Sequence, residues 1–255
     1  MKPLSITHWD YRAKKVKNDM NINIMDIYQR NLEYEEIIPY LNEKDVVLEV
    51  GCGNGYSTSV FRKFVKHIDA FDCSKHMIAR AKKAFGEVNN SFLVDNVLRI
   101  KKLNKKYDVI ICVRVLINLK NLEEQKLALN NFTSLLKENG KLILFEGFLD
   151  GFRKLNNIRK KVGLANIEPA KINFYSKVNE VLFLLKQKFI IKKQMHLGSY
   201  DYLTRFVYPY LVSTNSMKHN TIFHKKAQSL ADAYNPNFLK KFSRIRGFLL
   251  IKKHF

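Results

Sequence analysis

The sequence has few cysteines and no long run of apolar residues. Cys52, Cys73 and Cys112 form no C-x-x-C pair and have no pair of histidines nearby, so neither a disulfide framework nor a zinc site is indicated. No stretch reaches the ~18 uninterrupted apolar residues that a membrane helix needs. The opening segment MKPLSITHWDYRAKK lacks the apolar core of a signal peptide. These absences predict a soluble, cytoplasmic protein with reduced thiols.

Acidic residues are scarce relative to basic ones. The 23 Asp and Glu residues face 45 Lys and Arg residues, which gives a formal net charge of +22. Such a field attracts polyanions, whether nucleic acid, phosphorylated metabolites or an anionic membrane surface. The basic residues are mostly scattered lysines, and no arginine cluster is interleaved with aromatic residues. A nucleic-acid partner therefore stays open but is not favoured over a small anionic molecule.

Glycine is also sparse, with ten residues, yet three of them alternate in one short segment. Residues 46–50 form an apolar, β-branched run, and Gly51, Gly53 and Gly55 follow at once, which predicts a buried strand, a tight turn and a helix. Gly55 comes one residue too early for the G-x-G-x-x-G dinucleotide fingerprint. No Lys follows a suitably spaced second glycine, so a Walker phosphate loop is also disfavoured. The free N–H groups at the start of the helix predict a site for another small ligand.

Segments of strand and helix character alternate along the chain. Apolar runs predict strands at 46–50, 67–71, 91–94, 107–113, 141–145, 189–192 and 247–252. The pattern predicts an α/β fold, a doubly wound, mostly parallel seven-stranded sheet with helices on both faces. Residues 1–44 predict helices before the first strand, and 45–255 form the main domain. The alternation of strand and helix signals is interrupted at about 148–176, which predicts an insertion after the fifth strand.

The segment E-x-G-x-G-x-G, from Glu49 to Gly55, resembles the first motif of class I S-adenosylmethionine (SAM)-dependent methyltransferases. The resemblance covers about residues 40–150. It implies a Rossmann-like fold, SAM as the cofactor and S-adenosylhomocysteine (SAH) as its product. It also implies that the N-terminal helices form a lid and that the insertion forms a cap over the acceptor.

The resemblance extends to the acids that follow the second and third strands. It implies that Asp72 accepts hydrogen bonds from the ribose hydroxyls, that Asp95 accepts one from the adenine amino group, and that Val97 packs on the ring. The cofactor-binding residues predicted in this way are Glu49, Gly51, Gly53, Gly55, Asp72, Asp95, Asn96, Val97 and Val113.

The end of the fourth strand is expected, by the same resemblance, to face the methyl group. It reads Cys112-Val113-Arg114-Val115 and lacks the [DNS]-P-P-[YFW] pattern of base-amino methylation. We interpret Cys112 as a buried hydrophobe. No set of carboxylates suited to a divalent metal can be assembled, so metal-free catalysis is predicted. Arg114 either anchors an anionic substrate group or pairs with a structural carboxylate.

A hydroxyl acceptor would benefit from a base, for which His8, Glu146 and His196 are the candidates. The predicted substrate-binding residues are polar or aromatic side chains that core packing could equally explain: Tyr28, Arg114, Asn118, Tyr175, Tyr200 and Arg205.

Residues 146–164 also resemble bacterial methyltransferases that modify cell-surface saccharides or their activated precursors, including capsular phosphoramidate decorations. The leading hypothesis is a SAM-dependent O-methyltransferase for a small anionic metabolite or an activated saccharide precursor of the capsule. A phosphate or phosphoramidate oxygen would already be anionic and would need only positioning. Two alternatives stay open: an RNA methyltransferase and a non-catalytic SAM-binding regulatory protein.

Overall fold

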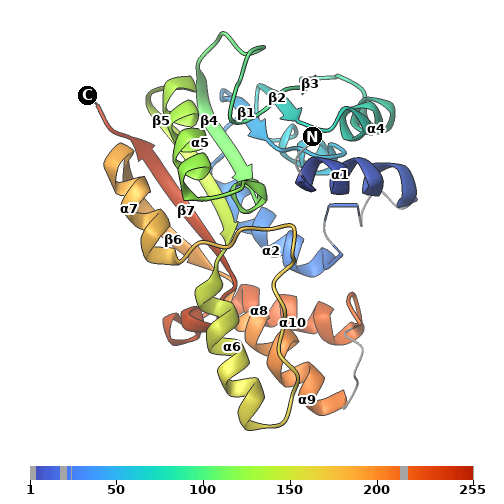
Figure 1. Ribbon diagram of the computed structural model, residues 1–255. Coiled ribbons are helices and arrows are strands. Elements are labelled where there is room, and N and C mark those ends of the chain that lie inside the picture. The colour runs from blue at the N-terminus through green and yellow to red at the C-terminus, as the bar shows by residue number, and fades with distance from the viewer. Residues whose placement is uncertain (1–3, 18–21, 24, 213–217, 255) are drawn as a thin grey trace.

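A seven-stranded sheet in the order β3-β2-β1-β4-β5-β7-β6 forms the centre of the computed structural model, which describes residues 4–17, 22–23, 25–212 and 218–254 (Figure 1). The first five strands pair in parallel, and β7 runs antiparallel to both β5 and β6. The strands are β1 (Val46–Val50), β2 (His67–Asp72), β3 (Asn90–Val94), β4 (Tyr107–Val113), β5 (Leu136–Gly147), β6 (Phe189–His196) and β7 (Ile245–Lys252). The predicted α/β class and mostly parallel seven-stranded sheet are thus confirmed.

Helices cover both faces of the sheet and extend beyond one of its edges (Figure 1). The α-helices are α1 (Leu4–Lys15), α2 (Ile27–Ile37), α3 (Tyr56–Phe61), α4 (Lys75–Phe85), α5 (Leu122–Leu135), α6 (Leu149–Lys161), α7 (Val178–Lys188), α8 (Gly198–Tyr202), α9 (Tyr208–Val212) and α10 (Ile222–Ala233). Short 3-10 helices span Ile38–Tyr40, Leu116–Asn118 and Asn237–Phe242, and a π-helix spans Leu203–Val207. Among the described residues, no helix combines the length and apolar character needed to cross a membrane.

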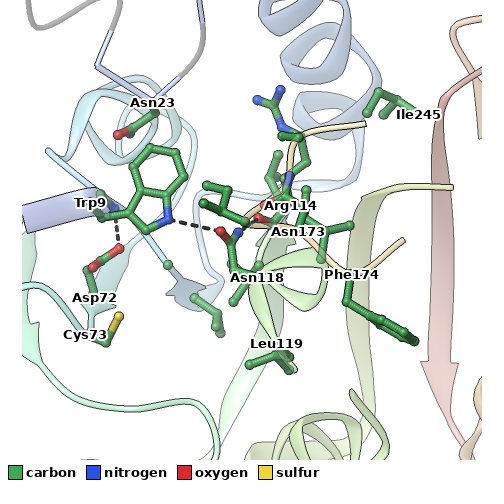
Figure 2. Close-up of a pocket in the computed structure, with 18 of the residues that line it drawn as sticks. Trp9, Asn23, Asp72, Cys73, Arg114, Asn118, Leu119, Asn173, Phe174 and Ile245 are labelled. Carbon is green, nitrogen blue, oxygen red and sulfur yellow. Dashed lines mark hydrogen bonds between the residues drawn. The ribbon is translucent and has the colours of Figure 1, made fainter. Parts of the chain in front are cut away.

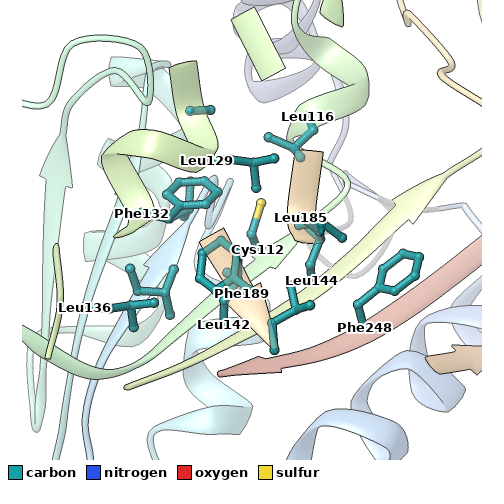
Figure 3. Close-up of a cluster of buried hydrophobic side chains, with 14 of the residues drawn as sticks. Cys112, Leu116, Leu129, Phe132, Leu136, Leu142, Leu144, Leu185, Phe189 and Phe248 are labelled. Carbon is teal, nitrogen blue, oxygen red and sulfur yellow. The ribbon is translucent and has the colours of Figure 1, made fainter. Parts of the chain in front are cut away.

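The apolar residues of the central strands point alternately to two separate cores, because side chains along a strand alternate between the faces of a sheet. Leu48 of β1 belongs to the core beneath α5 and α7, whereas Val47 belongs to the core beneath α2, α3 and α10. Cys112 lies fully buried in the first core, beside Leu129 of α5 and Leu185 of α7 (Figure 3). Its surroundings agree with the interpretation of this cysteine as a buried hydrophobe.

We call the helices beyond the carboxyl ends of the parallel strands the cap. They come from more of the chain than the predicted insertion at about 148–176. Helix α6 lies beyond the carboxyl ends of the parallel strands, as do α8, α9 and α10 (Figure 1), and it contacts the π-helix Leu203–Val207 and the 3-10 helix Asn237–Phe242. Since β7 is antiparallel to both β5 and β6, the latter two strands point the same way. The segments that follow β5 and β6 therefore emerge at the same edge of the sheet, and both contribute to the cap.

After β6 the chain forms α8, the π-helix Leu203–Val207 and α9. One π-turn rotates the residues that follow it relative to a regular helix, and such turns are frequent at functional sites.

Candidate active site

A cavity of about 1120 Å³ lies at the carboxyl ends of β1, β2 and β4 and continues under the cap (Figure 2). Ligand pockets typically measure about 300–1,000 Å³, so this volume can hold a cofactor and a second molecule. The carboxyl edge of a doubly wound sheet is also where such folds bind their ligands. The cavity is therefore the candidate active site.

The glycine turn after β1 forms one wall of this cavity. Gly51 and Gly53 line it with φ angles of 70° and 54°, a backbone region that side chains disfavour. A Cβ atom on Gly53 would lie 2.4 Å from Nδ2 of Asn23. Gly55 does not line the cavity, and a Cβ atom there would lie 2.7 Å from the ring of Phe92. This glycine therefore allows close packing behind the turn, and its predicted contact with the cofactor stays a prediction.

Glu49, at the end of β1, lies beneath the turn and lines the cavity. Its carboxylate accepts hydrogen bonds from the hydroxyls of Ser57 and Thr58, the latter at 2.6 Å. Burial raises the pKa of Glu49 to about 7. The carboxylate therefore fastens β1 to the first turn of α3 and fixes the shape of the glycine turn.

Asp72, at the end of β2, lines the cavity opposite Trp9 (Figure 2). Its carboxylate accepts hydrogen bonds from the backbone N–H of Gly53 at 3.1 Å and of Ser74 at 2.8 Å. Burial raises the pKa of Asp72. A carboxylate has about four acceptor positions, so Asp72 can hold the glycine turn and still accept from a ligand hydroxyl.

The loop after β3 brings Asp95, Asn96 and Val97 to the cavity. Val113, at the end of β4, also lines it. The Asp95 carboxylate accepts from the backbone N–H groups of Asn96 at 2.8 Å and Lys102 at 2.9 Å, and from that of Lys101. These bonds fix the loop that follows β3. Asp95 therefore has a structural task besides the adenine contact that the sequence predicts for it.

Glu146 is buried behind the cavity wall rather than in it. Its carboxylate accepts from the backbone N–H of Val115 at 2.9 Å, Leu116 at 2.7 Å and Ile117 at 3.2 Å. Burial raises its pKa to about 8, although the hydrogen bonds from these three N–H groups act to lower it. The residue does not line the cavity. The structure thus gives this carboxylate the task of holding the turn after β4, and a role as a base stays a prediction.

Arg114 begins that turn with a φ of 54°, and its guanidinium lies 3.1 Å from the buried Glu33 carboxylate. Of the two interpretations left open, the structure thus shows the pairing with a carboxylate. Asn118 lines the cavity, donates to the Arg114 carbonyl at 2.7 Å and accepts from the Trp9 indole N–H at 3.0 Å (Figure 2). The turn therefore joins α2 to the N-terminal helix α1.

The other two candidate bases also lie outside the cavity. His8 contacts the edge of the Trp9 ring at a centroid distance of 5.1 Å, and burial lowers its pKa. His196 ends β6, accepts from the Gly198 N–H at 3.2 Å, and has a pKa lowered to about 4 by burial and by Arg246. Neither histidine lines the cavity. Their position does not support a role as bases at this site, and that role stays a prediction.

Of the predicted acceptor residues, Arg114, Asn118, Tyr175 and Arg205 line the cavity. Tyr28 and Tyr200 do not, so the structure does not support their assignment as acceptor residues. Tyr28 packs against the core beneath α2, and Tyr200 is fully buried with its hydroxyl donating to Asp26 at 2.6 Å. Both aromatic rings pack in or against the core, and the Tyr200 hydroxyl has a hydrogen-bond partner.

Several cavity residues were missed by the sequence interpretation. Arg30 lies 4.1 Å from the centroid of the Tyr56 ring, Arg244 lies 2.6 Å from Asp201, and His219 contacts Arg205. Arg30 belongs to α2, whereas Arg244 immediately precedes β7. Because these residues are far apart in the chain, no local motif could have indicated that they meet.

One group of metal-ligand type occurs among the described residues, formed by Asp26, His219 and His224, whose ligand atoms lie within 4.8 Å of one another. Arg205 Nη2 lies 2.5 Å from Asp26 Oδ2, and Arg205 Nη1 lies 3.2 Å from His219 Nδ1. A guanidinium therefore already provides the positive charge at these two ligand atoms. Metal-free catalysis stays a prediction.

Comparison with known proteins identifies relatives of this fold. A family profile described as a methyltransferase domain matches residues 20–179. The N-methyltransferase NodS of Bradyrhizobium japonicum, solved with SAH, aligns with 98% of this chain and 99% of its own at a TM-score of 0.59 and 12% identity. The magnesium protoporphyrin IX methyltransferase of Synechocystis, also solved with SAH, aligns with 97% and 94% at a TM-score of 0.58 and 15% identity.

A sequence relative and a further structure extend the comparison. Nodulation protein S of Azorhizobium caulinodans is 33% identical over 100 residues, which are 38% of this chain. The match spans 46% of that relative, less than half of its length. A phosphoethanolamine N-methyltransferase of Haemonchus contortus, solved with phosphoethanolamine and SAH, aligns with 97% of this chain and 48% of its own at a TM-score of 0.63 and 15% identity.

Proposed function

Because this chain belongs to the methyltransferase domain family and is a class I SAM-dependent methyltransferase, we propose that it methylates an oxygen of a small anionic acceptor. The acceptor class is an anionic metabolite or an activated saccharide precursor, such as one used in capsule synthesis. The reacting oxygen belongs to a phosphate or phosphoramidate group, or to another group on the same molecule. A cytoplasmic location is part of this proposal.

The observation that carries the proposal is that the two ends of one cavity are lined by different kinds of residue. The glycine turn and Asp72 line one end, whereas Arg205 of the π-helix and Arg244, which pairs with Asp201 of α8, line the part beneath the cap. Guanidinium groups bind carboxylate and phosphate oxygens through paired N–H donors. A cofactor at the first end and an anionic acceptor at the second would share the same cavity.

SAM fits the first end on the features of this chain, and when bound it supplies an electrophilic methyl group. Asp72 lines the cavity and would accept hydrogen bonds from the ribose, while Val97 and Val113, which also line it, would supply apolar surface. The missing Cβ atoms of Gly51 and Gly53 leave room for close approach to the backbone. In-line displacement needs the acceptor held in position more than it needs acid or base groups, and the walls of the cavity would provide that restraint.

The position of the candidate bases favours an acceptor oxygen that is already anionic. A neutral hydroxyl benefits from a base within hydrogen-bond reach, and His8, Glu146 and His196 do not line the cavity. His219 does line it, but its Nδ1 is occupied by Arg205 Nη1 at 3.2 Å. A phosphate or phosphoramidate oxygen needs no proton removal. Positioning by the arginines beneath the cap is then sufficient.

An amine acceptor is the second candidate. The relatives support it, because the NodS structure and the phosphoethanolamine enzyme are both named N-methyltransferases. A phosphorylated amine would also match the arginines beneath the cap. The RNA methyltransferase and the non-catalytic SAM-binding protein remain alternatives, and the arginines that line the cavity favour a small anionic acceptor over both.

The test is transfer of a radiolabelled methyl group from SAM to a panel of phosphomonoesters, phosphoramidates, carboxylates, amines and RNA. We expect transfer to a small anionic acceptor, with the label stable at an oxygen. Transfer to RNA alone, with binding that weakens steeply as salt rises, would establish the RNA alternative. Tight SAH binding without transfer to any acceptor would refute the enzymatic proposal.

A further inference from the structure

Arg205 is a buried arginine with an unused hydrogen-bond donor. It lies in the π-helix Leu203–Val207, is 3% exposed and lines the cavity. Two of its nitrogens are occupied, Nη2 by Asp26 at 2.5 Å and Nη1 by His219 at 3.2 Å. Its buried Nε has no hydrogen-bond partner within the part of the chain that the structure describes. Buried donors are normally paired, so this N–H indicates a missing acceptor atom.

Arg244 is a second guanidinium in the same cavity. Its Nε and Nη2 donate to Oδ1 of Asp201 at 3.0 Å and 2.6 Å, and Nη2 also donates to Gln29 at 3.2 Å. Burial and then the positive charge of Arg244 lower the pKa of Arg205. Two like charges that feel each other in a buried site repel, and an anion between them would relieve the repulsion.

The two guanidiniums are each held by one buried carboxylate, Arg205 by Asp26 and Arg244 by Asp201. A guanidinium offers several N–H donors in a planar fork, so a single carboxylate does not use all of them. A phosphate monoester group has three terminal oxygens and can accept from two guanidiniums at once, which a carboxylate with two oxygens does less well.

We propose that Arg205 and Arg244 form a subsite for a phosphate monoester group of the acceptor, with the Arg205 Nε–H as a direct donor. This subsite rests on the proposed function, because it assigns part of the same cavity to the acceptor. Asp26 competes with the phosphate for the Arg205 guanidinium and sets the affinity of the subsite. His219 holds the third nitrogen of Arg205 and keeps the guanidinium oriented.

The test uses inorganic phosphate as the probe and the full chain saturated with SAH, with binding followed by calorimetry. Arg205→Gln should weaken phosphate binding by about tenfold or more, as expected for the loss of a charged hydrogen-bond donor. Asp26→Asn should tighten it several-fold, because the competing carboxylate is removed. Arg153→Gln removes an exposed arginine from the same cap and should change the affinity less than about twofold.

The double variant Asp26→Asn with Arg205→Gln removes both partners of the ion pair and guards against misfolding of the single variant. It should bind SAH as the parent does and lose phosphate binding. Unchanged phosphate affinity in a variant without Arg205, or weaker binding in Asp26→Asn, would overturn the subsite. Acetate that binds more tightly than phosphate would overturn the phosphate class. Phosphate binding as expected, without methyl transfer to any acceptor, would refute the proposed function and leave the subsite standing.

Discussion

The buried Glu146 carboxylate gives a prediction that separates a structural role from a catalytic one. Its pKa is raised to about 8 by burial, from 4.5 in the unfolded chain. Between these values the folded state holds a proton that the unfolded state has lost. Raising the pH from 5.5 to 8 should therefore lower the free energy of unfolding contributed by this residue by about 3 kcal/mol, at ~1.36 kcal/mol per pKa unit.

Glu146→Gln removes this titration while keeping the size of the side chain. The amide oxygen can still accept from Val115 and Leu116, but its NH₂ group would face the Ile117 N–H. We expect a loss of about 1–3 kcal/mol at the pH where the parent is most stable. The difference between parent and variant should shrink as the pH rises, because only the parent loses the stability that protonation provides.

The assay is urea unfolding of both proteins at pH 5.5 and pH 8, since other titrating groups cancel in the difference between them. A difference that stays the same at both values would show that the carboxylate is ionised throughout, and the reasoning would be wrong. Methyl-transfer rates measured on folded protein give the second readout. A variant of normal stability whose kcat falls by orders of magnitude would restore Glu146 as a base.

Two further predictions concern cofactor binding, and a third concerns metal-free catalysis. Asp72→Ala should raise the Kd for SAH by about 10- to 150-fold, since hydrogen bonds to a charged group contribute about 1.5–3 kcal/mol; calorimetry measures it. Gly53→Ala should weaken SAH binding as well as the fold, because its φ is 54° and the new Cβ would displace Asn23. A chelator should leave the methyl-transfer rate unchanged, as metal-free catalysis predicts.

Matched controls exist for each of these changes. Asp108→Ala removes a carboxylate that accepts from the Val46 N–H at the other end of β1 and should not change the Kd for SAH. Gly86→Ala also places a side chain at a positive φ, 60°, with a ψ of −163°, but has open space around its Cβ. Equal loss of SAH affinity in Gly53→Ala and Gly86→Ala would contradict the contact argument. A rate that falls with chelator and returns with a divalent cation would contradict metal-free catalysis.

The sequence predicted the sheet well because strand signals are local. The apolar run at 46–50 and the glycines that follow it need no distant partner to be recognised, and all seven predicted strands are present. Strand limits were less accurate: β5 begins at Leu136 although the prediction begins at 141. The early part of β5 contains the exposed polar residues Lys137, Glu138 and Asn139. This part of the strand therefore lacks the apolar run from which the other strands were predicted.

The acceptor half could not be predicted in the same way, since its residues come together only through the topology. Glu33 and Arg114 pair across more than eighty positions of sequence, and Asp26 and Arg205 across more than 170. A polar residue in a helix indicates neither its partner nor its burial. The three candidate bases illustrate this limit, because each is a reasonable catalytic residue by type and each lies outside the cavity.

The turn from Arg114 to Asn118 is the element through which the two halves of the site are in contact. A Cβ atom on Gly51 would lie 2.3 Å from Val115 Cγ2, so this valine packs against the glycine turn. At its other end, the Ile117 carbonyl accepts from the Phe174 N–H of the cap at 2.7 Å. Because Glu146 fixes the backbone between these contacts, a shift of the turn must move the cofactor wall and the acceptor wall together. Cofactor binding and acceptor binding are therefore expected to be coupled through this turn, even though the residues that contact each ligand are different.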